Sequence, residues 1–191
     1  MDRPDLVVRA ADHFGDLLAT LADDDWSKPT PCNEWDVGDL VDHVIGGNRF
    51  TVEILAGATA DDAMASVVAS FEGGTPDRVA AFRSSADRQL AAISAPGALD
   101  RMCHHPSGDY PGEVILGFRL GDLVLHGWDL ARSIGDDEQI DPELVEAVWA
   151  EMEPRAHLLA ATGRFGEGRS GTVAEDASLQ DRLLDLAGRR P

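Results

Sequence analysis

Basic residues are scarce in this sequence. Lysine and arginine together number 16, against 35 aspartates and glutamates, which gives a formal net charge of −19. Proteins that bind nucleic acid or an anionic membrane surface do so through a basic face. The charge balance therefore argues against both classes of partner and favours small molecules or other protein chains.

Cysteines and long apolar runs are also few. Cys32 and Cys103 are the only cysteines, and they lack the density of a disulfide scaffold and the paired spacing of a zinc ribbon. We expect both to be reduced thiols. No run approaches the roughly 18 apolar residues of a membrane span, and the first residues form an amphipathic repeat where a signal peptide would be apolar throughout. The sequence therefore predicts a cytoplasmic protein.

Strand-like alternation is not found over any six residues, whereas helical periodicity recurs along the chain. The segment 94–112 holds too many helix breakers and is either two short extended pieces or a loop. A chain of 191 residues with 43% hydrophobic content fits one all-α domain over residues 1–191, a helical bundle with a short carboxy-terminal helix. Apolar spacing predicts helices over about 4–23, 36–56, 61–72, 76–93, 113–134 and 142–162, and one near the carboxy terminus.

The helix predicted over 113–134 is largely apolar but carries Asp122, His126 and Asp129 on one face. Asp122 and His126 lie one turn apart, at i and i+4, so both can reach the same ion. Asp129 can accept a hydrogen bond from the His126 ring and orient it, or it can be a capping or surface carboxylate. Arg119 shares this face, where it either attracts an anionic substrate or pairs with an acid on the surface.

A catalytic zinc site typically has three protein ligands and one open position, so a third ligand is needed. His43 lies at the edge of the apolar stripe of the 36–56 helix, and Gly46 and Gly47 allow a neighbouring helix to come close. His43 is either this ligand or a satisfied histidine at a helix interface. The other four histidines lie on an exposed helix side, in the 94–112 segment or near a helix end: His13, His104, His105 and His157.

Two stretches resemble signatures of the DinB-like metal-binding proteins related to mycothiol-dependent maleylpyruvate isomerase: WSKPTPCNEWDVGDLVDHVIGG (26–47) and LGDLVLHGWDLARSIG (120–135). Residues 164–191 resemble the closing segment of the same family. The resemblance implies a four-helix bundle in which three side chains from two helices, with water, hold a divalent metal. The family's ligand positions fall on His43, Asp122 and His126. Two imidazoles and a carboxylate suit zinc first, with nickel or iron as alternatives.

The resemblance also bears on function, with two departures. Asp122 stands where the isomerase has a glutamate, and the isomerase has a further carboxy-terminal domain, whereas this sequence ends with its tail helix, so isomerisation itself is not expected. The implied chemistry is a metal-dependent S-transfer, in which a small-molecule thiol such as mycothiol is joined to an electrophilic substrate. Metal-dependent hydrolysis and a noncatalytic metal- or ligand-binding module are the alternatives.

Large apolar side chains predict two further features. Trp149, Leu158 and Leu159 give the 142–162 helix surplus apolar surface, which favours a homodimer. Trp26 and Trp35 bracket a proline-rich connection, and we expect them to pin it against the bundle in a structural role.

Overall fold

The computed structural model describes residues 2–157 and 168–191. The chain is mostly helical, with one small antiparallel sheet. Contacts divide it into two compact units, an N-terminal unit (Met1–Asp136) and a C-terminal unit (Asp137–Pro191). Each unit is described by itself, and the single domain expected over 1–191 stays a prediction.

The helices of the N-terminal unit lie where apolar periodicity predicts them. Side chains of Asp2, Asp36, Thr59 and Asp77 accept hydrogen bonds from backbone N–H groups at the starts of four helices, which satisfies donors that a helix leaves unpaired at its first turn. The elements in order are α1 (Arg3–Thr20), η1 (Asp25–Ser27), α2 (Val37–Ala56), α3 (Ala60–Ala69), α4 (Arg78–Ile93), β1 (Met102–His105), β2 (Gly108–Pro111) and α5 (Gly112–Ile134).

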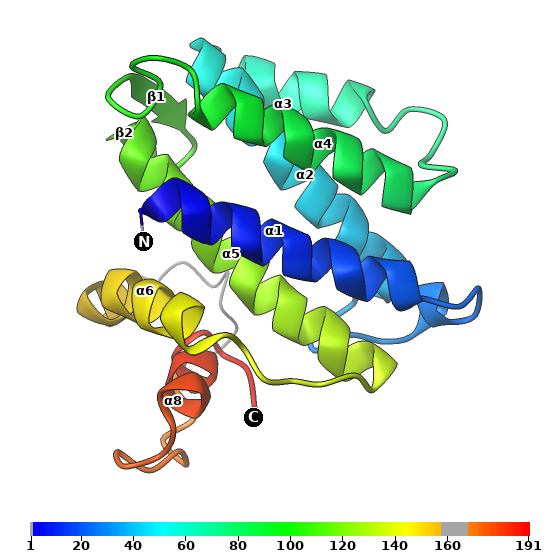
Figure 1. The fold of residues 1–191 in the computed structure, drawn as a ribbon, viewed down its shortest axis with the longest axis vertical. Helices are drawn as coiled ribbons and strands as arrows, with labels where there is room; N and C mark the ends of the chain where they lie inside the picture. The colour runs from blue at the N-terminus through cyan, green and yellow to red at the C-terminus, as the bar shows by residue number, and fades with distance from the viewer. Residues whose placement is uncertain (1, 158–167) are drawn as a thin grey trace. The chain divides into compact units, whose positions relative to one another are not determined.

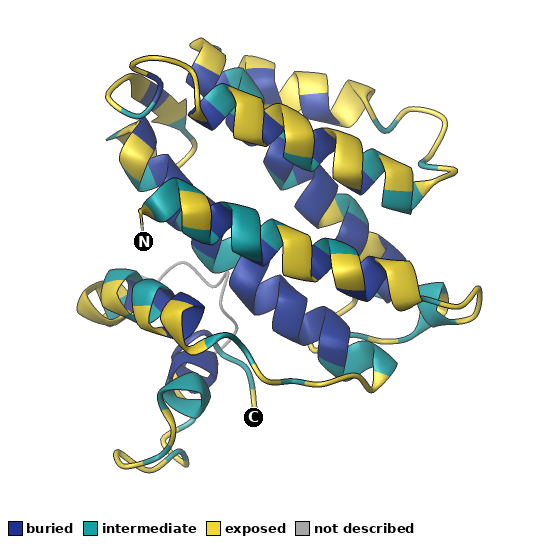
Figure 2. Ribbon diagram, in the orientation of Figure 1, coloured by how far each residue is buried: buried dark blue, intermediate teal, exposed yellow. Residues whose placement is uncertain are grey.

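Four of these helices share the core of the N-terminal unit. α1 packs against α4 and α5, α2 packs against the same two helices, and α3 packs on α2. In Figure 1, α1 crosses in front of α5, and α4 lies above it in the view. Figure 2 shows that α5 is buried along most of its length, whereas α1 and α4 each keep an exposed face. Polar side chains on α5 are therefore placed in an interior and need partners there.

The segment predicted to be either a loop or two extended pieces contains a short hairpin. β1 and β2 pair antiparallel, with Met102 opposite Pro111 and His105 opposite Gly108. This corrects the strictly all-α expectation to a mostly helical fold with a small sheet. Each strand has only four residues, which is too short for the alternation that marks a strand in a sequence.

The C-terminal unit contains α6 (Pro142–Met152), η2 (Glu153–Arg155) and α8 (Leu179–Leu186). As predicted, α6 starts with Asp141 as its cap and Pro142 in its first turn. The predicted end of this helix at Thr162, and Leu158 and Leu159 of the predicted dimer face, lie outside the described residues. Over the described part of the chain, no helix is long and apolar enough to cross a membrane.

Candidate metal centre

Two helices, α2 and α5, bring together the three side chains singled out as ligands. Nε2 of His43 lies 3.3 Å from Oδ1 of Asp122, and Nε2 of His126 lies 3.3 Å from the same oxygen. One ligand atom from each residue falls within 4.8 Å of the other two. Ligand atoms about 2.1 Å from a tetrahedral ion lie roughly 3.4 Å apart. The donor set and its spacing therefore fit a single divalent metal.

The two glycines after His43 face different neighbours. A Cβ atom at Gly47 would overlap the guanidinium of Arg119 and would lie 3.5 Å from Oδ2 of Asp122. A Cβ at Gly46 would instead meet Val67 at an ordinary 3.4 Å. Gly47 is thus the residue that lets an α5 side chain reach α2, whereas Gly46 lies on the side of α3.

Arg119 is buried, with 4% of its side chain exposed. Its Nη1 is paired with Oδ2 of Asp122, its Nη2 donates to the carbonyl of Val44 at 3.0 Å, and its Nε donates to Oδ1 of Asn48 at 3.1 Å. These contacts lock one carboxylate oxygen of Asp122 and leave Oδ1 facing the two imidazoles. The expectation that Arg119 attracts an anionic substrate was based on its helix face alone.

Asn48 extends this network to α4. Its Oδ1 also accepts from Nε2 of Gln89 at 2.8 Å, and its Nδ2 donates to the hydroxyl of Ser85 at 2.9 Å. All three side chains are at least 97% buried. Sequence reasoning missed them, although a signal existed: Asn48 continues the apolar stripe through Val41, and Ser85 and Gln89 follow Phe82 at i+3 and i+7.

The charges of the centre reinforce one another. Burial alone would raise the pKa of the Asp122 carboxyl, but Arg119 and His126 outweigh burial and hold this pKa well below its ordinary value. Burial alone would lower the pKa of His126, but Asp122 and Asp129 outweigh burial and raise it well above the ordinary histidine value. The raised pKa favours the protonated form of His126 in the metal-free protein, and a metal ion that binds here would have to displace that proton.

The far side of the His126 ring faces two further residues. Its Nδ1 lies 3.0 Å from Oδ2 of Asp129, whose side chain is fully buried. The thiol of Cys32 lies 3.3 Å from the same carboxylate oxygen. Asp129 thus lies within hydrogen-bond distance of the ring it was predicted to orient, while the role itself stays a prediction. Cys32 was not expected here.

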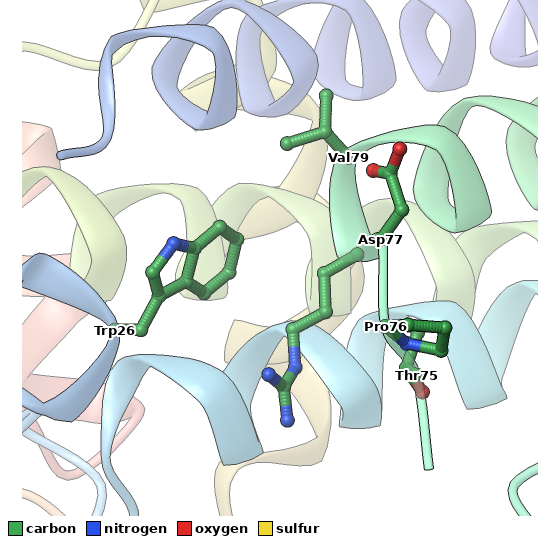
Figure 3. A pocket seen from close by; sticks show the side chains of 6 residues that line it. Trp26, Thr75, Pro76, Asp77 and Val79 are labelled. Atoms are coloured by element: carbon green, nitrogen blue, oxygen red, sulfur yellow. The ribbon is translucent and has the colours of Figure 1, made fainter. Parts of the chain in front are cut away.

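The two tryptophans of the proline-rich connection have different surroundings. The Trp35 ring lies 4.8 Å from the His43 ring and 6.0 Å from the His126 ring, centroid to centroid. Trp26 instead lines a pocket of about 370 Å³ beside the start of α4, together with Thr75, Pro76, Asp77, Arg78 and Val79 (Figure 3). This pocket contains none of the candidate ligands. The structural role expected for Trp26 and Trp35 stays a prediction. Of these two residues, Trp35 is the one that contacts the candidate ligands.

The other histidines lie apart from this centre. His104 pairs with Asp109 at 2.8 Å on the exposed hairpin, and the His105 ring lies 5.5 Å from the Phe118 ring. His13 and His157 are exposed. Within residues 2–157 and 168–191, none of these four belongs to a group of three potential metal ligands.

Comparison with known proteins identifies relatives of the chain. Residues 7–131 match the family model described as the mycothiol maleylpyruvate isomerase N-terminal domain. Two curated relatives from Mycobacterium tuberculosis, "Uncharacterized protein MT0763" (strain CDC 1551 / Oshkosh) and "Uncharacterized protein Rv0738" (strain ATCC 25618 / H37Rv), are each 36% identical over 137 residues. The match covers 71% of this chain and 69% of each relative.

Solved structures agree at the level of the fold. The crystal structure of the mycothiol-dependent maleylpyruvate isomerase superposes with a TM-score of 0.62 at 17% identity, and that of a histidine-to-alanine mutant with a TM-score of 0.64 at 16% identity. Each superposition covers 78% of this chain and 68% of the other.

Proposed function

Because the chain belongs to the mycothiol maleylpyruvate isomerase N-terminal domain family, we propose that it binds a divalent metal and uses it to activate a small-molecule thiol. The thiol is mycothiol where the cell makes it, and its acceptor is an electrophilic small molecule. We further propose that α1, α2, α4 and α5 form a DinB-like four-helix bundle, which the mutual packing of these helices supports.

The observation that carries the proposal is the convergence of His43, Asp122 and His126, whose ligand atoms lie within 4.8 Å of one another. Two imidazoles and one carboxylate favour zinc, with nickel or iron as alternatives. A divalent metal held there would lower the pKa of a thiol that binds to it and so supply a nucleophile near neutral pH.

Two neighbouring side chains hold the candidate ligands on α5 in place. Arg119 holds Oδ2 of Asp122, and Asp129 accepts from the ring of His126, so both α5 ligands are fixed from behind. His43 has 41% of its side chain exposed, and we propose that the thiol and the electrophile enter from its side. All three guanidinium nitrogens of Arg119 are engaged by protein acceptors. We therefore favour a role for Arg119 in holding Asp122 over direct substrate binding.

The first test is elemental analysis of untagged protein isolated from its own cells. About one equivalent of zinc, nickel or iron is expected. The second test incubates the protein with thiols and electrophiles and measures thiol adducts in the metal-loaded protein, the metal-stripped protein and His126→Ala, with His13→Ala as the matched control. Adducts formed only by metal-loaded wild type and His13→Ala support thiol transfer. Ester or amide cleavage without adducts would establish the hydrolase instead, and metal binding with neither activity the noncatalytic module.

The homodimer also stays a proposal. In the C-terminal unit, the guanidinium of Arg182 lies 4.7 Å from the centre of the Trp149 ring, so this predicted contact residue is already partly covered. Sedimentation at micromolar concentration tests the dimer. A species with the 20.4 kDa mass of one chain and no dimer would rule it out.

A further inference from the structure

The loop before α2 contains a short, tightly bonded turn that presents Cys32 to the buried side of the candidate centre. The amide of Cys32 donates to Oγ1 of Thr30 at 3.1 Å, and the amide of Trp35 donates to the carbonyl of Cys32 at 3.2 Å. The Thr30 amide donates in turn to the Trp35 carbonyl at 3.1 Å. These bonds fix the direction in which the Cys32 side chain leaves the loop.

The backbone at the tip of the turn is strained, which indicates that its surroundings impose this conformation. Glu34 has a φ of 67°, in the left-handed region that a glutamate rarely adopts. Such a conformation costs on the order of 1 kcal/mol or more and persists only where the surrounding structure imposes it. Here the strained residue lies between Cys32 and Trp35, both of which contact His126.

The contacts of Cys32 form a chain that ends at a metal ligand. Its Sγ lies 3.3 Å from Oδ2 of Asp129, and this oxygen lies 3.0 Å from Nδ1 of His126. A carboxylate has only acceptors, so the thiol and the ring N–H both donate to it. A neutral imidazole that donates from Nδ1 presents its lone pair at Nε2, the atom that lies 3.3 Å from Asp122.

We propose that Cys32 is a positioning residue of the metal centre. Its thiol donates to the Asp129 carboxylate and holds that carboxylate against Nδ1 of His126, so that the ring keeps a proton on Nδ1 and would offer the lone pair of Nε2 to a metal. This inference rests on the proposed metal function. It adds a second residue, after Asp129, behind His126, and this residue comes from the loop at residues 28–36.

Cys32 has a second conceivable role, because Cys32, His126 and Asp129 themselves form a group of potential ligands within 4.8 Å. Two observations favour positioning over ligation. A neutral imidazole offers one lone pair, and the α2 and α5 ligands already converge on Nε2. Oδ2 of Asp129 also lies 3.0 Å from Nδ1 of His126, closer than the roughly 3.4 Å that separates ligand atoms around a tetrahedral ion.

The test compares Cys32→Ala, which removes the donor, with Cys32→Ser, which keeps one. Cys103→Ala serves as the control, because Cys103 is the other cysteine of the chain and donates to the carbonyl of Arg101 in the hairpin region. Competition with a chromophoric chelator measures zinc affinity. We expect Cys32→Ala to bind zinc about tenfold more weakly, at the low end of effects seen for residues behind a ligand. Cys32→Ser and Cys103→Ala should bind zinc within about twofold of wild type, since both keep a hydrogen-bond donor to Asp129 at position 32.

Nitrogen NMR of the His126 ring supplies a readout that does not depend on metal. At a pH above the titration of His126, metal-free wild type and Cys32→Ser should show a single tautomer protonated at Nδ1, and Cys32→Ala a mixture of tautomers. The same tautomer mixture in wild type, or equal zinc affinity in wild type and Cys32→Ala, would overturn the proposal. A wild type that binds no zinc yet keeps the Nδ1 tautomer would overturn the proposed function alone.

Cobalt substitution distinguishes the positioning role from direct ligation. The cobalt-loaded wild type should show no sulfur-to-cobalt charge-transfer absorption in the near ultraviolet. A band of this kind that disappears in Cys32→Ser but persists in Cys103→Ala would make Cys32 a ligand and refute the positioning role.

Discussion

The candidate centre has an α5 half (Asp122 and His126) and an α2 half (His43). The two halves differ in burial and in how many neighbouring side chains hold them. On α5, His126 and Asp122 are 10% and 26% exposed, and each is held from behind by another side chain. On α2, His43 is 41% exposed, and its described contacts are the Asp122 carboxylate and the rings of Trp35 and His126. We infer from this difference a preorganised α5 half and an α2 half that is less tightly held by its neighbours.

Replacing each histidine by alanine is the strongest way to separate the two halves. Both His43→Ala and His126→Ala should weaken zinc binding by more than about 100-fold, beyond the effect of residues behind a ligand. Only His126→Ala should also destabilise the metal-free protein, by about 3 kcal/mol, because it leaves a buried carboxylate at Asp129 without its imidazole. Calorimetric titration with zinc measures the affinity. Denaturant unfolding in the presence of a chelator measures the stability of the metal-free protein.

His13→Ala and His157→Ala are the controls for these variants, and they should bind metal as wild type does. Stoichiometric metal in purified His126→Ala would contradict the assignment of the ligands. Equal destabilisation by His43→Ala and His126→Ala in chelator would contradict the difference between the halves.

Adding one methyl group at the contact between the helices tests how tightly the α5 half is built. Gly47→Ala should destabilise the protein by about 2 kcal/mol, the cost of overpacking, because its Cβ overlaps the buried Arg119. Gly46→Ala is the matched control one residue earlier. Its Cβ meets only ordinary contacts, so the higher helix propensity of alanine should make it neutral or stabilising by up to about 1 kcal/mol. Similar melting temperatures for the two variants would show that Arg119 is not confined as described.

The pH dependence of stability should differ between metal-free and metal-loaded protein. The pKa of His126 is raised in the folded protein, so its protonated form stabilises the metal-free fold fully below about pH 6.5, and this contribution disappears as the pH rises through the raised pKa. Zinc competes with the same proton, so zinc affinity should rise up to about tenfold per pH unit over this range. The pKa of Asp122 is lowered, so its contribution is lost only in acid.

Melting temperatures measured from pH 6 upward, with zinc and with chelator, check this prediction. The gap between the two series should widen with pH until the raised pKa of His126 is passed. A gap that stays constant across the series would mean that no proton of the centre is displaced by the metal.

Replacing Trp26 or Trp35, which precede α2, by phenylalanine should change stability and zinc affinity the least of these variants. We expect Trp35→Phe and Trp26→Phe each to lower stability by about 1 kcal/mol, because a smaller ring leaves unfilled space. Only Trp35→Phe should change zinc affinity, by no more than about threefold, since its ring packs against His43 without ligating the metal. Full stability in Trp35→Phe together with complete loss of activity would instead place this ring in the substrate site.

The helices and one pair of candidate ligands follow from local sequence patterns. Apolar periodicity locates α2 and α5, and the i, i+4 spacing of Asp122 and His126 places two candidate ligands side by side on one helix. The family resemblance indicated His43 as the candidate ligand across the interface. Local patterns left its role open, because pairing between helices is set by tertiary packing.

Contacts between distant segments account for what sequence reasoning missed. Cys32 and Asp129 are separated by 97 positions in the chain, so no periodicity relates them. Asn48 and Gln89 each interrupt an apolar stripe, but a single polar residue in a stripe does not say which partner satisfies it. The hairpin strands are shorter than the window in which alternation can be recognised.

The shared acceptor at Asn48 has a consequence for local unfolding. Oδ1 of Asn48 on α2 accepts hydrogen bonds from both Gln89 on α4 and Arg119 on α5, and its Nδ2 donates to Ser85 on α4. Opening α4 would therefore leave a buried amide donor without its acceptor, directly beside the guanidinium that holds Asp122. The metal centre and α4 should therefore open as one cooperative unit. Zinc bound to α2 and α5 should then slow amide hydrogen exchange in the middle of α4, a helix that supplies none of the ligands.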